Sequence, residues 1–220
     1  FLAAVGAQAD TDLTDGVQGL GSALTAIDVT GVRERLAGFD LVGVVPYEQT
    51  GARLLGLRGI TSIAGRDQGM DTHQLLAIDG NLERLVGLVD PAAAAEPGAG
   101  ACGGLGWVVL ALGGRLVSGT QMLGDRVALQ TLATAADLVV TGCTSFDFAT
   151  RGGGAVTAVA RAAEEAMTPC LAIAGEVLIG SREMRTMGIE AAYPVPGVGG
   201  GDPRGAVTEA ASRVARSWSW

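Results

Sequence analysis

Residues Pro97 to Gly106 carry the pattern most open to chemistry, because they read Pro-Gly-Ala-Gly-Ala-Cys-Gly-Gly-Leu-Gly and run directly into an apolar stretch. A glycine-rich loop that opens a helix can turn several backbone N–H groups toward one anion, and the helix dipole adds to the attraction. We therefore predict an anion-binding loop built on Gly98, Gly100, Gly103 and Gly104. An alternative stays open, in which the glycines only let a helix approach its neighbour closely.

The loop matches neither of the two common nucleotide-binding patterns. Gly98, Gly100 and Gly103 have the spacing of the dinucleotide fingerprint, but no strand pattern precedes them, and no acidic residue lies in the window 118–124 to bind a ribose. A Walker loop ends on Gly-Lys followed by Ser or Thr, and the chain has fifteen Arg and no Lys. Positive charge for a phosphate must therefore come from arginine.

Composition narrows the function classes. With 220 residues, of which 48% are hydrophobic, the chain can bury a core and should be a soluble protein of one large or two small domains. A net charge of −8 argues against nucleic acid or an anionic membrane as partner. No apolar stretch approaches the roughly 18 residues of a membrane span, and no signal peptide is recognised.

Cysteine and histidine usage removes several chemistries. Cys102, Cys143 and Cys170 are odd in number and lack C-x-x-C spacing, so we expect neither a disulfide framework nor a zinc site, and a cytoplasmic location. Cys143 has no His or Lys nearby in the sequence to favour a thiolate. The single histidine, His73, is expected at the surface of a helix, which leaves most catalytic triads and metal sites without a ligand. No metal-ligating residues are predicted.

The second half of the chain alternates short apolar strands with helices. Strands are expected over 138–141, 170–174 and 191–195, and helices over 105–112, 120–136, 155–167, 182–187 and from Asp202-Pro203 onward. This alternation predicts an α/β fold with a parallel sheet and helices on both faces. Ligands bind beyond the carboxyl ends of such strands, so the loops after Thr141 and Ala174 are the expected site.

The first half reads as a second α/β domain. A strand is expected over 41–45, and a helix over 72–89, with Asp71 as its cap. Residues 90–100 are rich in Ala, Pro and Gly and read as a linker at the domain boundary.

Three segments of the chain resemble the bacterial glycerate kinases of the two-domain α/β type. Pro97 to Gly106 differs from the family's Pro-Gly-Ala-Gly-Ala-Ala-Gly-Gly-Leu-Gly only at Cys102. Asp137 to Gly142 is similar to the family's Ala-Asp-Leu-Val-Ile-Thr-Gly, and Thr168 to Gly175 is similar to its Val-Pro-Val-Ile-Ala-Leu-Ala-Gly. The resemblance covers nearly the whole chain but only the later portion of the family, whose opening motifs have no counterpart here.

Two further segments carry the resemblance more weakly. The spacing of four glycines resembles the family's Gly-Pro-Asn-Gly stretch leading to Gly-Pro-Gln-Lys-Gly; these are Gly56, Gly59, Gly65 and Gly69. Val5 to Gly16 resembles Gly-Gly-Ser-Ala-Thr-Asn-Asp-Gly-Gly, with Asp12 on its aspartate. The chain begins at Phe1 with an apolar run and no Met, as expected of a fragment or a trimmed product that starts at a strand.

The resemblance implies a domain assignment and a function. Residues 1–90 would form a second, inserted-type α/β domain, and residues 91–220 a Rossmann-like α/β domain that lacks its opening strands and so exposes a sheet edge. The implied activity is ATP- and magnesium-dependent phosphorylation of glycerate or a similar small hydroxy acid. The alternatives are a catalytically inactive relative that binds a small anion or a protein partner, and a fragment of a larger enzyme; a homo-oligomer also stays open.

The same resemblance assigns site residues. Asp147 is the expected base or magnesium contact, and Asp12, Gly65 and Gly69 are the expected substrate-binding residues. The nucleotide is assigned to the four loop glycines together with Gly142 and Thr150.

Several charged residues of the family's site are replaced. Its loop reads Thr-Gly-Glu-Gly-Arg-Leu-Asp-Gly-Gln-Ser or -Thr and then Gly-Lys, and the positions of its Glu, Arg, Gln and Lys hold Cys143, Ser145, Ala149 and Gly154. The lysine of Gly-Pro-Gln-Lys-Gly is Gln68. Phosphoryl transfer depends on positive charge at the phosphate oxygens, so activity would require compensation by arginine. The candidates are Arg53, Arg66 and Arg151.

Overall fold

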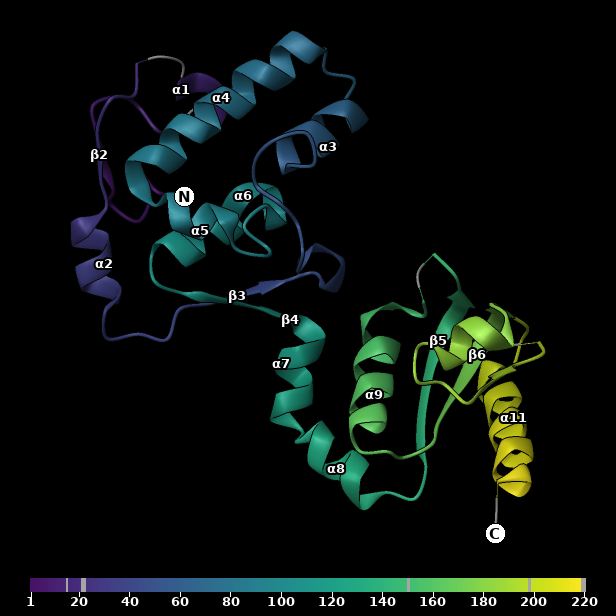
Figure 1. Cartoon of the computed structure of the whole chain (residues 1–220). Coiled ribbons are helices and arrows are strands. Elements are labelled where there is room, and N and C mark those ends of the chain that lie inside the picture. The colour runs from purple at the N-terminus through teal and green to yellow at the C-terminus, as the bar shows by residue number, and fades with distance from the viewer. Residues whose placement is uncertain (15, 21–22, 150, 198, 219–220) are drawn as a thin grey trace. The chain divides into compact units, whose positions relative to one another are not determined.

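The computed structural model describes residues 1–14, 16–20, 23–149, 151–197 and 199–218, which fold into two compact units, Phe1–Gly119 and Thr120–Trp220 (Figure 1). We call these unit 1 and unit 2. The mixed α/β architecture with parallel strands that the sequence predicts is confirmed.

Unit 1 consists mainly of helices. In chain order it contains β1 (Gln8–Ala9), α1 (Gly16–Leu20), β2 (Ile27–Asp28), α2 (Thr30–Leu36), β3 (Val42–Val45), a short 3-10 helix (Tyr47–Gln49), α3 (Ile60–Asp67), α4 (Thr72–Val89), α5 (Pro91–Ala95), α6 (Ala101–Ala111) and β4 (Arg115–Ser118). β1 and β2 pair antiparallel, and β3 and β4 pair parallel. The apolar run at residues 1–6, expected to begin a strand, instead forms turns.

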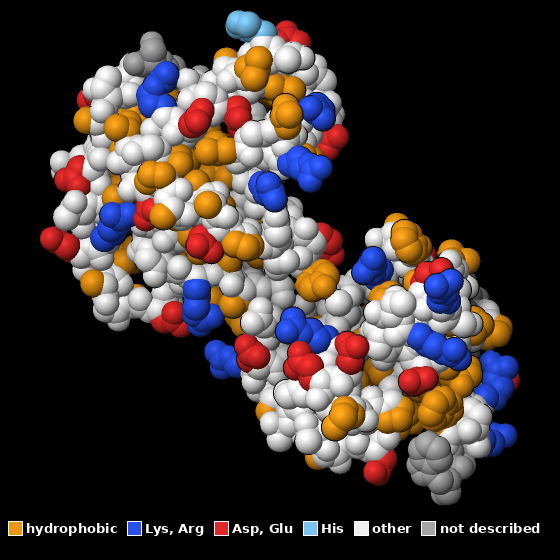
Figure 2. All heavy atoms as spheres, viewed as in Figure 1, with side chains coloured by type: hydrophobic (Ala, Val, Ile, Leu, Met, Phe, Trp, Pro, Cys, Tyr) orange, Lys and Arg blue, Asp and Glu red, His pale blue; other side chains and the backbone are white. Residues whose placement is uncertain are grey.

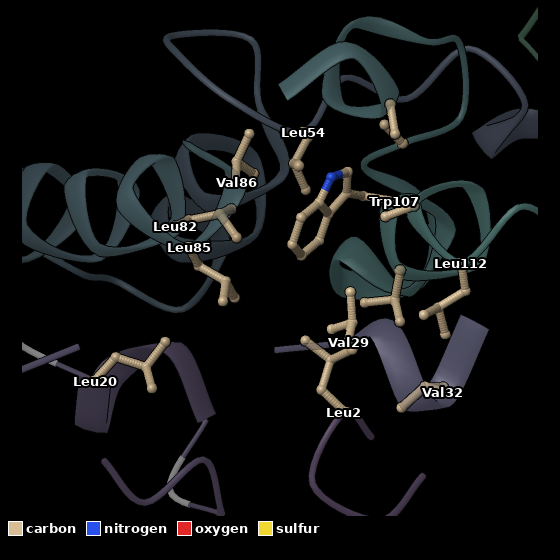
Figure 3. Packing of buried hydrophobic residues seen from close by; sticks show 14 of the residues in the cluster. Leu2, Leu20, Val29, Val32, Leu54, Leu82, Leu85, Val86, Trp107 and Leu112 are labelled. Atoms are coloured by element: carbon tan, nitrogen blue, oxygen red, sulfur yellow. The ribbon is translucent and has the colours of Figure 1, made fainter. Parts of the chain in front are cut away.

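Helix α4 forms where the sequence places it because its signals are local. Asp71 and Gln74 make a capping box, in which the Asp71 carboxylate accepts from the Gln74 amide at 2.9 Å and the Gln74 side chain accepts from the Asp71 amide at 2.9 Å. Leu82, Leu85 and Val86 lie on the buried face and point toward the indole of Trp107 in α6 (Figure 3).

The division of the chain differs from the predicted boundary at residue 90. The predicted linker contains α5, whose first turn is capped by Asp90, and the Asp90 carbonyl accepts a hydrogen bond from Trp107 Nε1 at 3.1 Å. Ala93 and Ala99 belong to the same buried cluster as α4. Residues 90–112 therefore complete the core of unit 1, and the assignment of residues 91–220 to one Rossmann-like domain stays a prediction.

Unit 2 is built around a three-stranded parallel sheet in the order β5-β6-β7. Its elements are α7 (Gly119–Arg126, beginning at the boundary), α8 (Leu129–Ala135), β5 (Val139–Asp147), α9 (Gly153–Glu165), β6 (Cys170–Leu178), α10 (Ser181–Arg185), β7 (Ala191–Pro194) and α11 (Pro203–Ser217). α9 packs against β5 and β6, and α10 and α11 contact β7. Phe146 and Val156 are fully buried and belong to the same hydrophobic cluster.

Three predicted elements of the second half are corrected. The helix expected over 120–136 is two helices, because Ala128 adopts a left-handed conformation with φ 51° between α7 and α8. The strands expected to end at Thr141 and Ala174 continue to Asp147 and Leu178. The loops that were expected to follow Thr141 and Ala174 are therefore strand, and the carboxyl ends of β5 and β6 lie several residues later.

Candidate functional site

Three consecutive amides of the glycine-rich loop donate hydrogen bonds to oxygens of the protein itself. Gly100 N–H donates to the carbonyl of Ala52 at 3.0 Å, and Ala101 N–H donates to the carbonyl of Gly98 at 2.8 Å. Cys102 N–H donates to the side-chain oxygen of Gln49 at 2.8 Å. Protein oxygens therefore already accept from these three amides, and the predicted binding of an anion by Gly98, Gly100, Gly103 and Gly104 stays a prediction.

Close approach explains why several of these positions are glycine. A Cβ on Gly98 would lie 2.9 Å from Leu116 Cδ1, and a Cβ on Gly100 would lie 2.0 Å from the carbonyl oxygen of Arg53. At Gly106 a Cβ would lie 2.1 Å from the carbonyl oxygen of Gly98. The backbone segments touch where a side chain has no room, so the alternative of glycines that permit close packing is the one that the contacts support.

The beginning of α6 is a left-handed turn rather than regular helix. Cys102, Gly103 and Gly104 have φ values of 52°, 72° and 96°, and the regular helix follows them. Gly103 has open space where a Cβ would be, and it faces a groove.

An open groove of about 380 Å³ lies in unit 1 between α1, α3 and α4. Its wall contains Gly16 and Val17 of α1, Ile60, Thr61, Ala64 and Gly65 of α3, Gln68 and Met70 after α3, Ile78 and Leu82 of α4, and Gly103. Three segments that are far apart in sequence and that resemble the kinase family therefore meet here, through Gly16, Gly65 and Gly103. Thr61 and Gln68 give this mostly apolar groove side chains that can form hydrogen bonds.

Gly65 and Gly69 also have structural roles in α3. Gly65 is buried, and a Cβ there would lie 2.3 Å from Leu75 Cδ2. Gly69 has φ +73° and ends the helix in a Schellman motif, in which its amide donates to Arg66 O at 3.0 Å and the Met70 amide donates to Gly65 O at 2.9 Å. Their assignment to substrate binding stays a prediction, with Gly65 in the groove wall.

Asp12 lies in a turn of its own near α1. Its Oδ1 accepts from Thr14 Oγ1 at 2.7 Å and from the Thr14 amide at 2.8 Å. The hydroxyl and then the amide of Thr14 lower the pKa of Asp12, because both stabilise the ionised carboxylate. The carboxylate is exposed and does not line the groove, so its predicted contact with substrate stays untested.

The second candidate cluster lies at the carboxyl end of β5 in unit 2. Cys143, Ser145 and Asp147 alternate along the strand and so share one face. Ser145 Oγ donates to Asp147 Oδ2 at 3.2 Å, and the position of a Cβ on Gly152, just before α9, lies 3.1 Å from Cys143 Sγ. This face is therefore the one that the start of α9 covers, and it combines a thiol, a hydroxyl and a carboxylate.

The two remaining predicted cofactor residues have different outcomes. Gly142 pairs with Ile173 within the sheet, and a Cβ there would lie 2.7 Å from the Ile173 carbonyl oxygen. Its place in a strand differs from the expected loop, and glycine is required there by close backbone approach. Thr150 lies outside the described residues.

Burial raises the pKa of the Cys143 thiol, and the neighbouring Asp147 carboxylate raises it further. We expect Asp147→Asn to speed alkylation of Cys143 by less than about tenfold at mildly alkaline pH, because removing the smaller of two causes lowers the pKa only in part. Peptide mass spectrometry after timed iodoacetamide treatment measures the rate.

Cys170 is the internal control for this measurement. It is fully buried, burial raises its pKa to about 11, and it pairs with Val139 at the far end of β5. The alkylation rate of Cys170 should be the same in the unsubstituted chain and in Asp147→Asn. If Asp147→Asn left the alkylation rate of Cys143 unchanged or made it slower, the proposed effect of the Asp147 carboxylate on the pKa of Cys143 would be contradicted.

Basic side chains are dispersed over the molecule. Arg53 and Arg66 are exposed in unit 1, and Arg151 is exposed in unit 2. Figure 2 shows acidic and basic side chains interspersed over the visible face. Within the described ranges, no three His, Cys, Asp or Glu side chains are grouped to hold a metal ion, and no helix is both long and apolar enough to span a bilayer.

Sequence reasoning did not find the role of Gln49. Its side chain binds the loop amide of Cys102 from a position 53 residues earlier in the chain. A glutamine at the end of a short 3-10 helix carries no local signal for such a contact, so only the tertiary structure reveals it.

Comparison with known proteins assigns the chain to a family. The sequence model of the glycerate kinase family matches residues 1–217. An uncharacterized protein of Mycobacterium bovis is 32% identical over 91% of this chain and 52% of its own length. The glycerate kinase of Bacillus subtilis is 31% identical over 80% of this chain and 47% of its own length.

A similar fold is found in a crystal structure from Salmonella typhimurium LT2, of a protein provisionally named glycerate kinase 2. The TM-score is 0.69 at 24% sequence identity, and the match covers 100% of this chain and 60% of the other. The chain thus spans about half the length of the curated relatives that it matches. The match of the family model over almost every residue establishes that this chain belongs to the glycerate kinase family.

Proposed function

We propose that this chain forms part of a glycerate kinase-like phosphotransferase, which transfers a phosphoryl group from MgATP to a hydroxyl of glycerate or of a similar small hydroxy acid. The observation that carries the proposal is the groove of about 380 Å³, where Gly16, Gly65 and Gly103 of three family-like segments meet. A groove of this volume has room for a three-carbon acid. Thr61 and Gln68 would supply hydrogen bonds to it. The reaction consumes ATP, and we place it in the cytoplasm, in line with three free cysteines.

The resemblance to the family makes Asp147 of unit 2 the candidate general base for the attacking hydroxyl, and this assignment is proposed independently of the groove in unit 1. A carboxylate suits this task because it can be ionised and held in one orientation, and Ser145 Oγ donates to its Oδ2 at 3.2 Å. MgATP is the second substrate. No contact of its phosphates with the glycine-rich loop is proposed, because Ala52, Gly98 and the Gln49 side chain already accept from the loop amides.

That same observation favours a second candidate function. A relative that kept the fold but lost catalysis would need neither loop amides free to bind a phosphate nor a lysine. The amides of residues 100–102 donate to protein oxygens, and the sequence contains no lysine. Such a protein would bind a small anion or a protein partner without turnover.

An assay of ADP release with glycerate and MgATP separates the two candidates. We expect turnover by the chain, and Asp147→Asn should reduce it by about 10² to 10⁴-fold, the usual contribution of a general base. The matched control is Asp125→Asn, an exposed carboxylate on α7, which should leave turnover unchanged.

One outcome contradicts the kinase itself, and another contradicts the role of Asp147. Absence of turnover, together with no thermal shift in the presence of ATP or glycerate, would leave the non-catalytic relative. Full activity of Asp147→Asn would remove Asp147 from the reaction.

A further inference from the structure

We propose that the hydroxy acid bound by unit 1 carries an apolar group of about the size of a benzene ring, and that this group enters a second pocket next to the groove. This substrate class rests on the proposed function, because it concerns the same groove. Three features of unit 1 point to it: walls that the two spaces share, the apolar lining of the second pocket and the uncharged lining of the groove.

The second pocket adjoins the groove. It has a volume of about 150 Å³ and lies between α1, α4 and α6. The walls of both spaces contain the same four residues, which are Gly16, Val17, Leu82 and Gly103. No atom lies within 4 Å of a Cβ placed on Gly16 or on Gly103, so two of the four shared positions leave space open. A ligand in the groove can therefore extend into the second pocket.

The lining of the second pocket is apolar. Leu20, Leu85 and Trp107 are buried side chains of its wall, and they lie around the same part of unit 1 in Figure 3. Apart from three glycines, every described residue of this wall carries an aliphatic or aromatic side chain. The one polar side-chain atom among them, Trp107 Nε1, already donates to the carbonyl of Asp90. An apolar cavity of about 150 Å³ stays dry and can bind benzene, so this pocket suits a phenyl group.

The groove itself offers little to a small anion such as glycerate. Among the described residues of its wall none is charged, and only Thr61 and Gln68 carry a hydroxyl or an amide in the side chain. A carboxylate without a cationic partner is stable only while water hydrates it. We therefore place the carboxylate at the open side of the groove, with Thr61 and Gln68 near the polar end of the ligand. The apolar group then supplies most of the free energy of binding.

Two acids that differ only by a phenyl group test this substrate class. 3-Phenyllactate should bind the chain at least about tenfold more tightly than lactate, because burial of a phenyl group strengthens binding by at least this factor. An NMR titration of the chain with each acid measures both dissociation constants.

The indole N–H signals in the same titration locate the ligand. The Trp107 signal should shift on binding of 3-phenyllactate, because the indole is part of the pocket wall. Trp218 is the internal reference in unit 2, where its Nε1 donates to the Tyr193 hydroxyl at 2.8 Å. The Trp218 signal should stay unchanged.

Two leucine-to-tryptophan variants provide the matched comparison. Leu105 lines the second pocket but not the groove and is 44% exposed, so a larger side chain there can cover the pocket without disturbing the core. Leu105→Trp should abolish the preference for 3-phenyllactate over lactate. Leu76→Trp, on the exposed face of α4 and outside both walls, should retain it. Circular dichroism checks that both variants fold.

Two results would overturn the apolar pocket as a substrate site. One is equal affinity of the unsubstituted chain for the two acids. The other is binding of 3-phenyllactate that leaves the Trp107 signal unchanged, which would place the ligand elsewhere.

ADP release from MgATP, measured with both acids and with glycerate, separates this substrate class from the proposed function. Binding of 3-phenyllactate at Trp107 without ADP release would support the apolar pocket and contradict the kinase. ADP release with glycerate, together with no binding of 3-phenyllactate, would support the kinase and overturn the apolar pocket.

Discussion

Replacing Trp107 with alanine is expected to lower the free energy of unfolding of unit 1 by about 3 to 5 kcal/mol, the usual cost of removing a large buried aromatic side chain. Trp107 is 1% exposed, and among the residues that the structure describes it is the largest fully buried side chain. Its indole lies among Leu82, Leu85 and Val86 of α4, as Figure 3 shows, so truncation leaves a cavity that a rigid helix cannot close.

Trp107→Ala also removes a hydrogen bond. Trp107 Nε1 donates to the carbonyl of Asp90 at 3.1 Å, between α4 and α5, and alanine leaves that oxygen without this donor. Trp107→Phe keeps most of the volume but loses the donor and part of the ring system, and we expect it to cost about 1 to 2 kcal/mol.

Because the chain has two units, its unfolding is best followed separately in each. Native-state hydrogen exchange should show the loss at amides of α4 and α6, while amides of β6 in unit 2 keep their protection. If Trp107→Ala lowered the free energy of unfolding of unit 1 by less than about 1 kcal/mol, the proposed role of Trp107 in the core would be contradicted.

Gly100→Ala is expected to lower the free energy of unfolding by about 3 kcal/mol, at the upper end of overpacking effects. The new Cβ would lie 2.0 Å from the carbonyl oxygen and 2.5 Å from the carbonyl carbon of Arg53. Both atoms are backbone, so relief requires a shift of the segment that leads into Leu54, which is fully buried. Chemical denaturation monitored by circular dichroism measures the change.

Gly51→Ala is the control for this substitution. No atom lies within 4 Å of a Cβ at Gly51, and we expect a change within about 0.5 kcal/mol. The pair also separates the two explanations of the glycine-rich loop. If Gly100 were glycine only to admit an anion, its alanine variant would be as stable as the Gly51 variant.

Elements with local signals could be predicted from the sequence. α4 begins and ends as expected because the Asp71–Gln74 capping box and the helical spacing of its leucines lie within the helix itself. β5 and β6 begin close to the predicted positions for the same reason, since each opens with an apolar run.

The ends of the strands could not be predicted in this way. Gly142, Cys143 and Ser145 have little apolar character. They remain extended because they pair with Ile173, Ala174 and Glu176 of β6, about thirty residues later. The break between α7 and α8 could not be predicted either, because the residue at the break is Ala128 and not glycine or proline.

The glycine-rich loop shows the limit of composition as a guide to function. A run of small residues before an apolar helix is equally compatible with an anion site and with close backbone packing. The contacts that distinguish them come from Gln49, Ala52 and Arg53, about fifty residues earlier. The sequence therefore predicts that the glycines of the loop are required, and the tertiary contacts show that they permit close backbone packing.

Because side chains alternate along β5, the direction in which the candidate base Asp147 points depends on the number of residues that precede it in the strand. Phe146 and Asp147 are neighbours on opposite faces of one strand, one fully buried and the other partly accessible. Insertion or deletion of one residue between Val139 and Ser145 would exchange the two faces for everything beyond it. An aromatic ring would be turned out of the core and a carboxylate into it, so evolution can vary the residue types along this strand more readily than it can vary their number.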